Sequence, residues 1–345
     1  MSHELSLPTR TTGHQSPAAK AAFEVELAVW CDGIRQLNCS LDFKVSSRGW
    51  CYILEEHGLS KGDFDKAENL INACRKSGML PLDICAEDVS HDFAGLEKLD
   101  DSDPEEEAAA WVYSIQTAFK SYTPFSFWDD QPYYIQLMVE KVDLRSLFSA
   151  MCETFRIPIA NAKGWSDLNS RAAMMRRFCD AEARGQQPVL LYCGDHDPAG
   201  LLISDSLRSN MADLAEVVGW HPEHLIIDRF GLNRDLIDRL GLTWIDGLKT
   251  GSKKGMDLAD PDHADYKKPY VQTYLAAHGA RKVEANVLVT RPDEGRALLH
   301  RTITKYLPMD APMTYQTRLA APREELRLAL LRAVTEMAAP GPDAN

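Results

Sequence analysis

Two apolar runs of this sequence end on carboxylates. Tyr134–Val139 ends directly on Glu140, and Val189–Cys193 is followed, after one glycine, by Asp195 and Asp197. Short apolar runs of this length are typical of buried strands. Because ligands of an open parallel sheet bind beyond the carboxyl ends of its strands, we expect these three carboxylates to meet at one edge of a sheet.

Three carboxylates at such an edge indicate a divalent cation. Mg²⁺ binds hard oxygen ligands and usually takes one or two carboxylates, several waters and substrate phosphates. Each aspartate alone has another interpretation, since aspartate often caps a helix and Pro198–Gly200 begins one. A glutamate that closes a separate strand favours the metal. We therefore predict Glu140, Asp195 and Asp197 as ligands of Mg²⁺, for which Mn²⁺ could substitute.

The composition is that of a soluble globular protein. The 345 residues are 45% apolar and 26% charged, which is ordinary usage. No run of apolar residues is long enough to span a membrane, and the polar N-terminus lacks the apolar core of a secretion signal. No two of the eight cysteines have C-x-x-C spacing, so we expect free thiols in a reducing compartment, the cytoplasm.

The net charge bears on possible partners. A formal charge of −13 is not that of a typical nucleic-acid binder. It does not exclude one, because a single basic groove can contact phosphates while acidic residues gather elsewhere.

The order of three motifs resembles the Toprim domain shared by topoisomerases, primases and some nucleases. Val139–Lys141 (VEK), Lys163–Ser166 (KGWS) and Gly194–Gly200 (GDHDPAG) follow one another along the chain. In that domain a strand ends in Glu, a second strand leads into a Gly loop, and a third ends in Asp-x-Asp. The resemblance implies a Rossmann-like, mostly parallel α/β sheet with a Mg²⁺ site.

The N-terminal part predicts a winged helix-turn-helix domain. Apolar periodicity indicates helices over Ala18–Leu37, after Ser46 and over Asp63–Gly78, with short extended segments between and after them. That pattern fits a winged helix-turn-helix. The stretches SSRGWCYILEEHGL and NACRKSGMLPLDICAED further resemble the winged-helix domain of the topoisomerase VI A-subunit family, which includes the meiotic double-strand-break protein.

This second resemblance implies a nucleophile. Arg48 and Tyr52 have the family's spacing of four, and in the family that tyrosine attacks a DNA phosphodiester to form a 5′-phosphotyrosyl link. A phenol with a pKa of about 10 needs activation. Arg48, one helical turn earlier on the same face, could hold the phosphate, with Glu140 assisting at the metal. The other interpretation makes Tyr52 a half-buried aromatic. The chain also departs from the family after Asp88, where Val89–His91 replaces a frequent arginine.

Basic side chains supply candidate DNA contacts. Arg75 and Lys76 end the third helix, Lys141 and Lys163 flank the expected metal, and a Gly- and Lys-rich loop follows Leu248. Each could equally face solvent. Glu284, in a stretch similar to the end of the family's Toprim domain, is implied as an auxiliary acidic residue. The predicted DNA-binding residues are Arg75, Lys76, Lys141, Lys163, Lys249 and Lys253.

Composition shifts and the two resemblances divide the chain. The predicted parts are a disordered tail (1–17), the winged helix (18–92), a linker and helix (93–130), the Toprim domain with a C-terminal extension (131–308), and a C-terminal helix and tail (309–345).

We expect a Mg²⁺-dependent DNA-cleaving protein that resembles the A subunit of a type IIB topoisomerase, with Tyr52 as nucleophile. By the same resemblance it is a homodimer in which each protomer cuts one strand. Because the sequence lacks a Gly-rich ATP-binding loop, strand passage would need a separate ATPase subunit. Two alternatives remain. One is a Toprim nuclease that uses water, for example in defence against plasmids or phage. The other is a non-catalytic scaffold that binds DNA or a partner.

Overall fold

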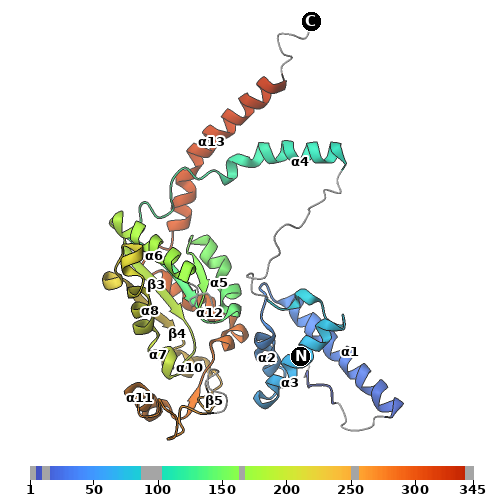
Figure 1. Ribbon diagram of the computed structural model, residues 1–345. Helices are drawn as coiled ribbons and strands as arrows, with labels where there is room; N and C mark the ends of the chain where they lie inside the picture. Colours follow the sequence, from blue (N-terminus) through green and yellow to red (C-terminus); the bar gives the residue numbers. More distant parts are fainter. Residues whose placement is uncertain (1–4, 10–15, 87–102, 163–167, 250–255, 339–345) are drawn as a thin grey trace. The chain divides into compact units, whose positions relative to one another are not determined.

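The computed structural model describes residues 5–9, 16–86, 103–162, 168–249 and 256–338 (Figure 1). The chain forms two compact units. The first comprises Met1–Asp88 and Tyr133–Lys305, and the second comprises Val89–Pro132 and Tyr306–Asn345.

A four-stranded parallel sheet is the centre of the first unit. Its order is β2-β1-β3-β4. Six of the seven residues are buried in both β1 and β3, as expected for strands covered on both faces. Val139 pairs with Cys193, so β1 and β3 end side by side. The predicted α/β class with a parallel sheet is confirmed. The strands are β1 (Tyr133–Val139), β2 (Ile159–Asn161), β3 (Gln187–Cys193) and β4 (Ile226–Gly231).

Helices cover both faces of this sheet, with α5 and α12 on one side and α6 and α8 on the other (Figure 1). The chain runs from β1 outward to β2 through α5, returns to β3 through α6, and continues to β4 through α8. Because such crossovers are right-handed, the reversal places α5 opposite α6. It also creates a switch point between β1 and β3, the usual ligand site of such sheets. The helices are α5 (Val142–Thr154), α6 (Leu168–Ala183), α8 (Ile203–Ala212) and α12 (Pro292–Ile303).

The N-terminal part of the first unit is helical. The Ser46 side chain caps α2, whose inner residues are buried almost throughout, and α3 packs against it. The backbone of Val45 forms a parallel bridge with that of Cys85. Residues 16–86 contain the expected helices but no β-hairpin. The elements are α1 (Pro17–Ser40), α2 (Ser47–Glu55), η1 (Lys61–Asp63), α3 (Phe64–Lys76) and η2 (Leu82–Ile84).

A small antiparallel ladder lies near the carboxyl ends of the large sheet. Ile245 pairs with Lys282 and Asp246 with Arg281, and the backbone of Val283 bridges to that of His196, just after β3. Leu248, Leu258, Val271 and Tyr274 form a separate apolar cluster beside it. The elements here are α7 (Pro198–Leu201), α9 (Ala215–Val218), η6 (Pro222–His224), α10 (Arg234–Leu240), β5 (Ile245–Asp246), α11 (Pro269–His278), β6 (Arg281–Lys282) and η7 (Ala285–Thr290).

The second unit is built from α4 (Pro104–Thr117), η4 (Ala118–Ser121) and the long α13 (Ala311–Ala338). Tyr315 on α13 packs edge-on against Phe125 and Phe127. Pro322 lies inside α13 without ending it. Over the described ranges of both units, no helix is long and apolar enough to cross a membrane.

Candidate functional site

Glu140 and Asp195 meet at the switch point of the sheet. Glu140 follows β1 and Asp195 follows β3, and the Asp195 amide donates to Glu140 Oε2 at 2.8 Å. A Cβ atom on Gly194, between the strand and the aspartate, would lie only 2.7 Å from the same carboxylate oxygen. The glycine after β3 therefore lets the glutamate side chain approach the backbone.

The ammonium group of Lys141 joins these two carboxylates. Its Nζ lies 2.7 Å from Glu140 Oε1 and 2.8 Å from Asp195 Oδ2. The other oxygen of Asp195 accepts a hydrogen bond of 2.8 Å from the backbone N–H of Ala285 in η7. The sequence suggested Lys141 as a DNA contact, whereas the structure places its ammonium between two predicted metal ligands.

Burial and charge set the protonation of this cluster. Burial, together with the negative charge of Glu140, raises the pKa of Asp195 to about 7 despite the opposing effect of Lys141. For Glu140 burial acts in the same direction, but the Lys141 ammonium and the Asp195 amide outweigh it and lower the pKa. Burial opposes the charge of Lys141 as well, yet Asp195 and Glu140 raise its pKa. The two carboxylates thus share one ammonium group, and Asp195 is the more readily protonated of the two.

Asp197 has a different local role. Its Oδ1 accepts a hydrogen bond of 2.6 Å from the amide of Gly200, so it caps the short helix α7. Burial raises its pKa. Within the residues that the structure describes, no group of three His, Cys, Asp or Glu side chains is arranged to hold a metal ion. Two of the three predicted ligands therefore share one cation position, and the third occupies a capping position beside them.

Arg229 organises the loop that carries the two aspartates, and the sequence analysis missed it. From β4 its guanidinium donates to the carbonyl oxygens of Asp195 at 3.0 Å, Gly200 at 2.9 Å and Leu232 at 2.9 Å. His196, between the aspartates, is buried and its Nδ1 lies 3.1 Å from Leu232 O. A charged residue inside the apolar run of β4 was the available signal.

Tyr52 and Glu284 form the second half of the site. The Tyr52 hydroxyl donates a hydrogen bond of 2.6 Å to Glu284 Oε2. Arg48 Nε lies 3.8 Å from the same carboxylate oxygen, and Lys282 Nζ lies 3.2 Å from Oε1. The spacing of four along α2 thus does bring Arg48 and Tyr52 to one carboxylate.

The surroundings of Tyr52 oppose its ionisation. Its side chain is 0% exposed, and burial together with the Glu284 carboxylate raises the pKa of the phenol well above its usual value. Lys61 Nζ lies 5.0 Å from the centre of the Tyr52 ring and 3.5 Å from Glu55 Oε2. This second cation beside the phenol was not foreseen, because no pattern distinguishes Lys61 from a surface lysine.

A buried aspartate of α5 bonds the residue that caps α2. Asp143, at the start of α5, accepts hydrogen bonds from the Ser46 amide and from the Ser46 hydroxyl, the latter at 2.7 Å. A Cβ atom on Gly49 would come within 2.8 Å of Asp143 Oδ2. The residue that holds the helix with Arg48 and Tyr52 therefore lies only three positions after Glu140 in the chain.

The remaining predicted DNA contacts lie elsewhere. Arg75 donates to the backbone oxygen of Leu82 at 2.9 and 2.6 Å. Lys76 and Lys249 are exposed. Lys163 and Lys253 lie outside the described residues.

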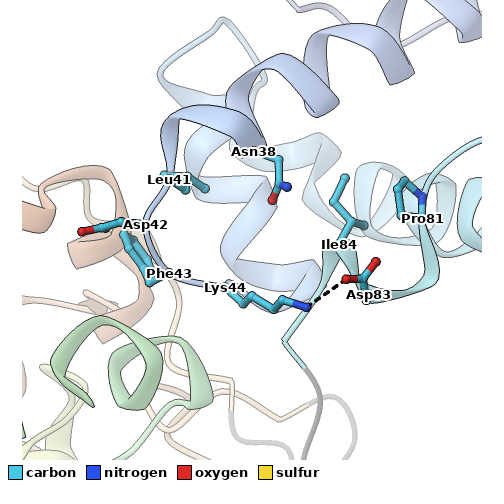
Figure 2. A pocket seen from close by; sticks show the side chains of 8 residues that line it. All are labelled: Asn38, Leu41, Asp42, Phe43, Lys44, Pro81, Asp83 and Ile84. Atoms are coloured by element: carbon cyan, nitrogen blue, oxygen red, sulfur yellow. Dashed lines mark hydrogen bonds and ion pairs between the residues drawn. The ribbon is translucent and has the colours of Figure 1, made fainter. Parts of the chain in front are cut away.

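A hollow of about 300 Å³ opens beside the N-terminal helices (Figure 2). Asn38, Phe43, Lys44 and Asp83 are among the residues that line it. Lys44 Nζ lies 3.1 Å from Asp83 Oδ2, so these two charges balance each other. None of the residues of the carboxylate site lines this hollow.

Comparisons with family models, with curated proteins and with solved structures gave no significant match. The proposed function therefore rests on the geometry of two groups of residues, Glu140, Lys141 and Asp195 in one and Tyr52 and Glu284 in the other.

Proposed function

We propose that this protein is a Mg²⁺-dependent DNA-cleaving enzyme in which Tyr52 attacks the phosphodiester. One observation carries the proposal. Glu284 accepts the hydrogen bond of the Tyr52 hydroxyl, while the amide of the next residue, Ala285, holds Asp195. Two consecutive residues thus link a tyrosine paired with a base to the carboxylates at the switch point.

The pairing of Tyr52 with Glu284 provides a proton acceptor for nucleophilic attack, while in the free protein burial and the same carboxylate raise the pKa of the phenol. A nucleophile within hydrogen-bond reach of a base is the usual arrangement for covalent catalysis. In the proposed step Tyr52 Oη bonds to phosphorus and its proton passes to Glu284. The bond from phosphorus to the 3′-oxygen breaks, and that oxygen keeps the electron pair and takes a proton from solvent. Arg48 would hold the phosphate oxygens.

The carboxylates match Mg²⁺ in chemistry. Glu140 and Asp195 both direct oxygens to one cation position, where Lys141 now lies, and burial together with the charge of Glu140 raises the pKa of Asp195. These two side chains would hold the ion, with Asp197 beside them, and Lys141 would have to move away. When bound, Mg²⁺ would stabilise charge on the phosphate and on the leaving oxygen. Mn²⁺ takes the same oxygen ligands.

The proposal includes a finer fold assignment, in which a winged-helix domain precedes a Toprim-like domain. A parallel sheet with carboxylates at its switch point supports a Toprim-like domain. The helices α2 and α3 with the Val45–Cys85 bridge support a winged-helix relative. By analogy with the topoisomerase VI A-subunit family, the proposal also includes DNA as the substrate, a homodimer and a separate ATPase subunit.

A hydrolytic mechanism is the second candidate, and one observation favours it. Tyr52 is 0% exposed, so attack on DNA would require α2 to move. If α2 stays in place, Tyr52 stabilises Glu284. A water held at Glu140 and Asp195 would then lose a proton to Asp195 and attack phosphorus, the bond from phosphorus to one sugar oxygen would break, and that oxygen would take a proton from solvent.

A plasmid-cleavage assay separates the two mechanisms. Protein and supercoiled plasmid are incubated with MgCl₂ or MnCl₂, quenched in SDS, and analysed with and without protease. The variants are Tyr52→Phe, Glu284→Gln and Asp195→Asn, with Tyr113→Phe as a matched control because Tyr113 is exposed in the second unit.

Tyrosine attack predicts breaks with protein on the 5′ end that Tyr113→Phe retains and the three site variants lose. Breaks with free ends that survive in Tyr52→Phe but not in Asp195→Asn would establish hydrolysis. Absence of metal-dependent breaks in the wild type would reject both mechanisms for the isolated chain.

A further inference from the structure

A cluster of cations around Trp244 lies next to the carboxylate site but takes no part in it. The guanidinium carbon of Arg281 lies 4.3 Å, and that of Arg234 5.3 Å, from the centre of the Trp244 ring. The imidazole of His278 lies nearly parallel to the indole, at 24° and 6.2 Å. We call Arg234, Trp244, His278 and Arg281 the Trp244 cluster.

Backbone and side-chain contacts hold the Trp244 cluster in place. Arg281 Nε donates to the carbonyl oxygen of His278 at 2.9 Å. The Tyr274 hydroxyl lies 2.9 Å from the carbonyl oxygens of both Arg281 and His196. Arg234 Nη1 lies 3.4 Å from His278 Nδ1. Both guanidinium groups are therefore positioned by Trp244 and by α11.

The segment that carries Arg281 continues directly into the site. Val283 pairs with His196 between the two aspartates, Glu284 accepts from Tyr52, and Ala285 donates to Asp195. The His196 ring also packs 5.6 Å from Trp244 and 4.7 Å from His278. Figure 1 shows α10, α11 and β5 gathered at this end of the first unit. The Trp244 cluster is thus joined to the carboxylate site by the His196 ring and by the chain segment that follows Arg281.

The charges of the Trp244 cluster are only partly neutralised. Arg234 forms an ion pair of 2.7 Å with Asp238. Within the described ranges no carboxylate lies within ion-pair distance of Arg281, although Asp246 is its backbone partner in the ladder. Burial and the two arginines lower the pKa of His278. Among the described residues Arg281 thus carries a charge without a carboxylate in ion-pair distance, on a chain with a net charge of −13, and such an arginine suits an anionic ligand.

We propose that the Trp244 cluster binds the phosphate backbone of duplex DNA beside the cleavage site. An arginine stacked on an aromatic ring keeps the N–H edge of its guanidinium free for two parallel bonds to a phosphate. Arg281 provides such an edge, because among the described residues only its Nε is bonded, to the carbonyl oxygen of His278. The Arg234 guanidinium already contacts Asp238 through Nε and His278 through Nη1, so it adds positive charge and its remaining N–H groups. Trp244 packs against both guanidinium groups. This inference rests on the proposed function, because it names the surface that holds the substrate of that site.

Fluorescence anisotropy with a labelled DNA duplex tests the proposal. EDTA keeps cleavage out of the measurement, and Kd is determined over a range of NaCl concentrations for the wild-type full chain, Arg281→Gln and Arg234→Gln. The matched control is Arg239→Gln, an exposed arginine on the same helix α10 outside the Trp244 cluster. Thermal unfolding of each variant checks the fold, and Arg281→Lys keeps the charge without the planar edge.

Each lost phosphate contact should make the slope of log Kd against log salt shallower by about 0.9. We expect this for Arg281→Gln and Arg234→Gln, the wild-type slope for Arg239→Gln, and weaker binding with a near-wild-type slope for Arg281→Lys. Unchanged slopes in both glutamine variants would overturn the proposal, as would absence of duplex binding by the wild type or a preference for duplex RNA. If the slopes change but no variant or wild type cleaves plasmid, the binding surface stands and the proposed cleavage fails.

Discussion

The ammonium nitrogen of Lys141 lies 2.8 Å from Asp195 Oδ2, in the position where a metal ion would contact that carboxylate. The same nitrogen contacts Glu140. The free protein thus balances part of its acidic site with a side chain from the strand end itself. Binding of a divalent cation would exchange one positive group for another.

This exchange predicts the behaviour of Lys141→Met in EDTA. Removing one partner of a buried ion pair leaves uncompensated charge, and we expect the free energy of unfolding to fall by about 2–4 kcal/mol. MgCl₂ should restore much of the loss, because the cation stabilises the state that binds it. Urea unfolding followed by circular dichroism measures both effects.

Lys66→Met is the control, since Lys66 pairs with Asp63 at the surface and its loss should change stability by less than about 1 kcal/mol. A Lys141→Met protein as stable as wild type in EDTA would show that the two carboxylates do not need the ammonium.

The raised pKa of Asp195 predicts how stability depends on pH without metal. Its folded pKa of about 7 exceeds the value of 3.8 for the free side chain. The folded state therefore holds the proton more tightly, and this contribution to stability is present below pH 4 and lost as the pH rises to 7. The lowered pKa of Glu140 contributes stability that is present at neutral pH and is lost only as the pH falls below about 4.5.

The substitution Asp195→Asn should remove the loss of stability that accompanies the rise in pH. At pH 7.5 in EDTA we expect the variant to be more stable than wild type by roughly 1–3 kcal/mol, with the difference shrinking toward pH 4. Chemical denaturation at several pH values measures it. A wild-type protein whose stability relative to Asp195→Asn does not change with pH would contradict the raised pKa.

The hydrogen bond from Tyr52 to Glu284 should appear as a coupling energy. In a double-mutant cycle of Tyr52→Phe and Glu284→Ala, we expect a coupling of roughly 1–3 kcal/mol, because hydrogen bonds to charged groups exceed neutral ones. Equilibrium unfolding of the four proteins provides the cycle. The hydroxyl of exposed Tyr113 should show no coupling with Glu284, and a value near zero for Tyr52 would mean that the pair does not form in solution.

Gly49 should respond to substitution in the opposite way to an ordinary helical glycine. Alanine usually stabilises a helix interior by up to about 1 kcal/mol, but here its Cβ would lie 2.8 Å from Asp143 Oδ2. We therefore expect Gly49→Ala to lower the melting temperature, and we expect a smaller effect in an Asp143→Ala background.

Gly62→Ala is the control for this substitution, because only Ser60 Oγ, at 3.8 Å, lies near its added Cβ. A Gly49→Ala protein that is more stable than wild type would mean that α2 is not held against Asp143.

The strands, their terminal carboxylates and the shared helix face of Arg48 and Tyr52 could be predicted from the sequence. Apolar runs that end on Glu140 and before Asp195 determined both the parallel strands and the carboxylates at their ends, because burial on two faces requires continuous apolar residues. A spacing of four determined that Arg48 and Tyr52 share a helix face. The sequence also indicated that Asp197 could cap a helix, since the residues after it begin one.

The partners of these residues were decided by the tertiary structure alone. Glu284 is 232 positions from Tyr52, and the Ala285 amide reaches Asp195 across 90 positions. Lys61 has no sequence pattern that sets it apart as a functional residue, and the charge of Arg229 inside the apolar run of β4 does not show which carbonyl groups it bonds. Periodicity reports which face of an element is buried, but which charges face each other depends on how the elements pack. For that reason the sequence did not show that Lys141, predicted to contact DNA, lies between two carboxylates.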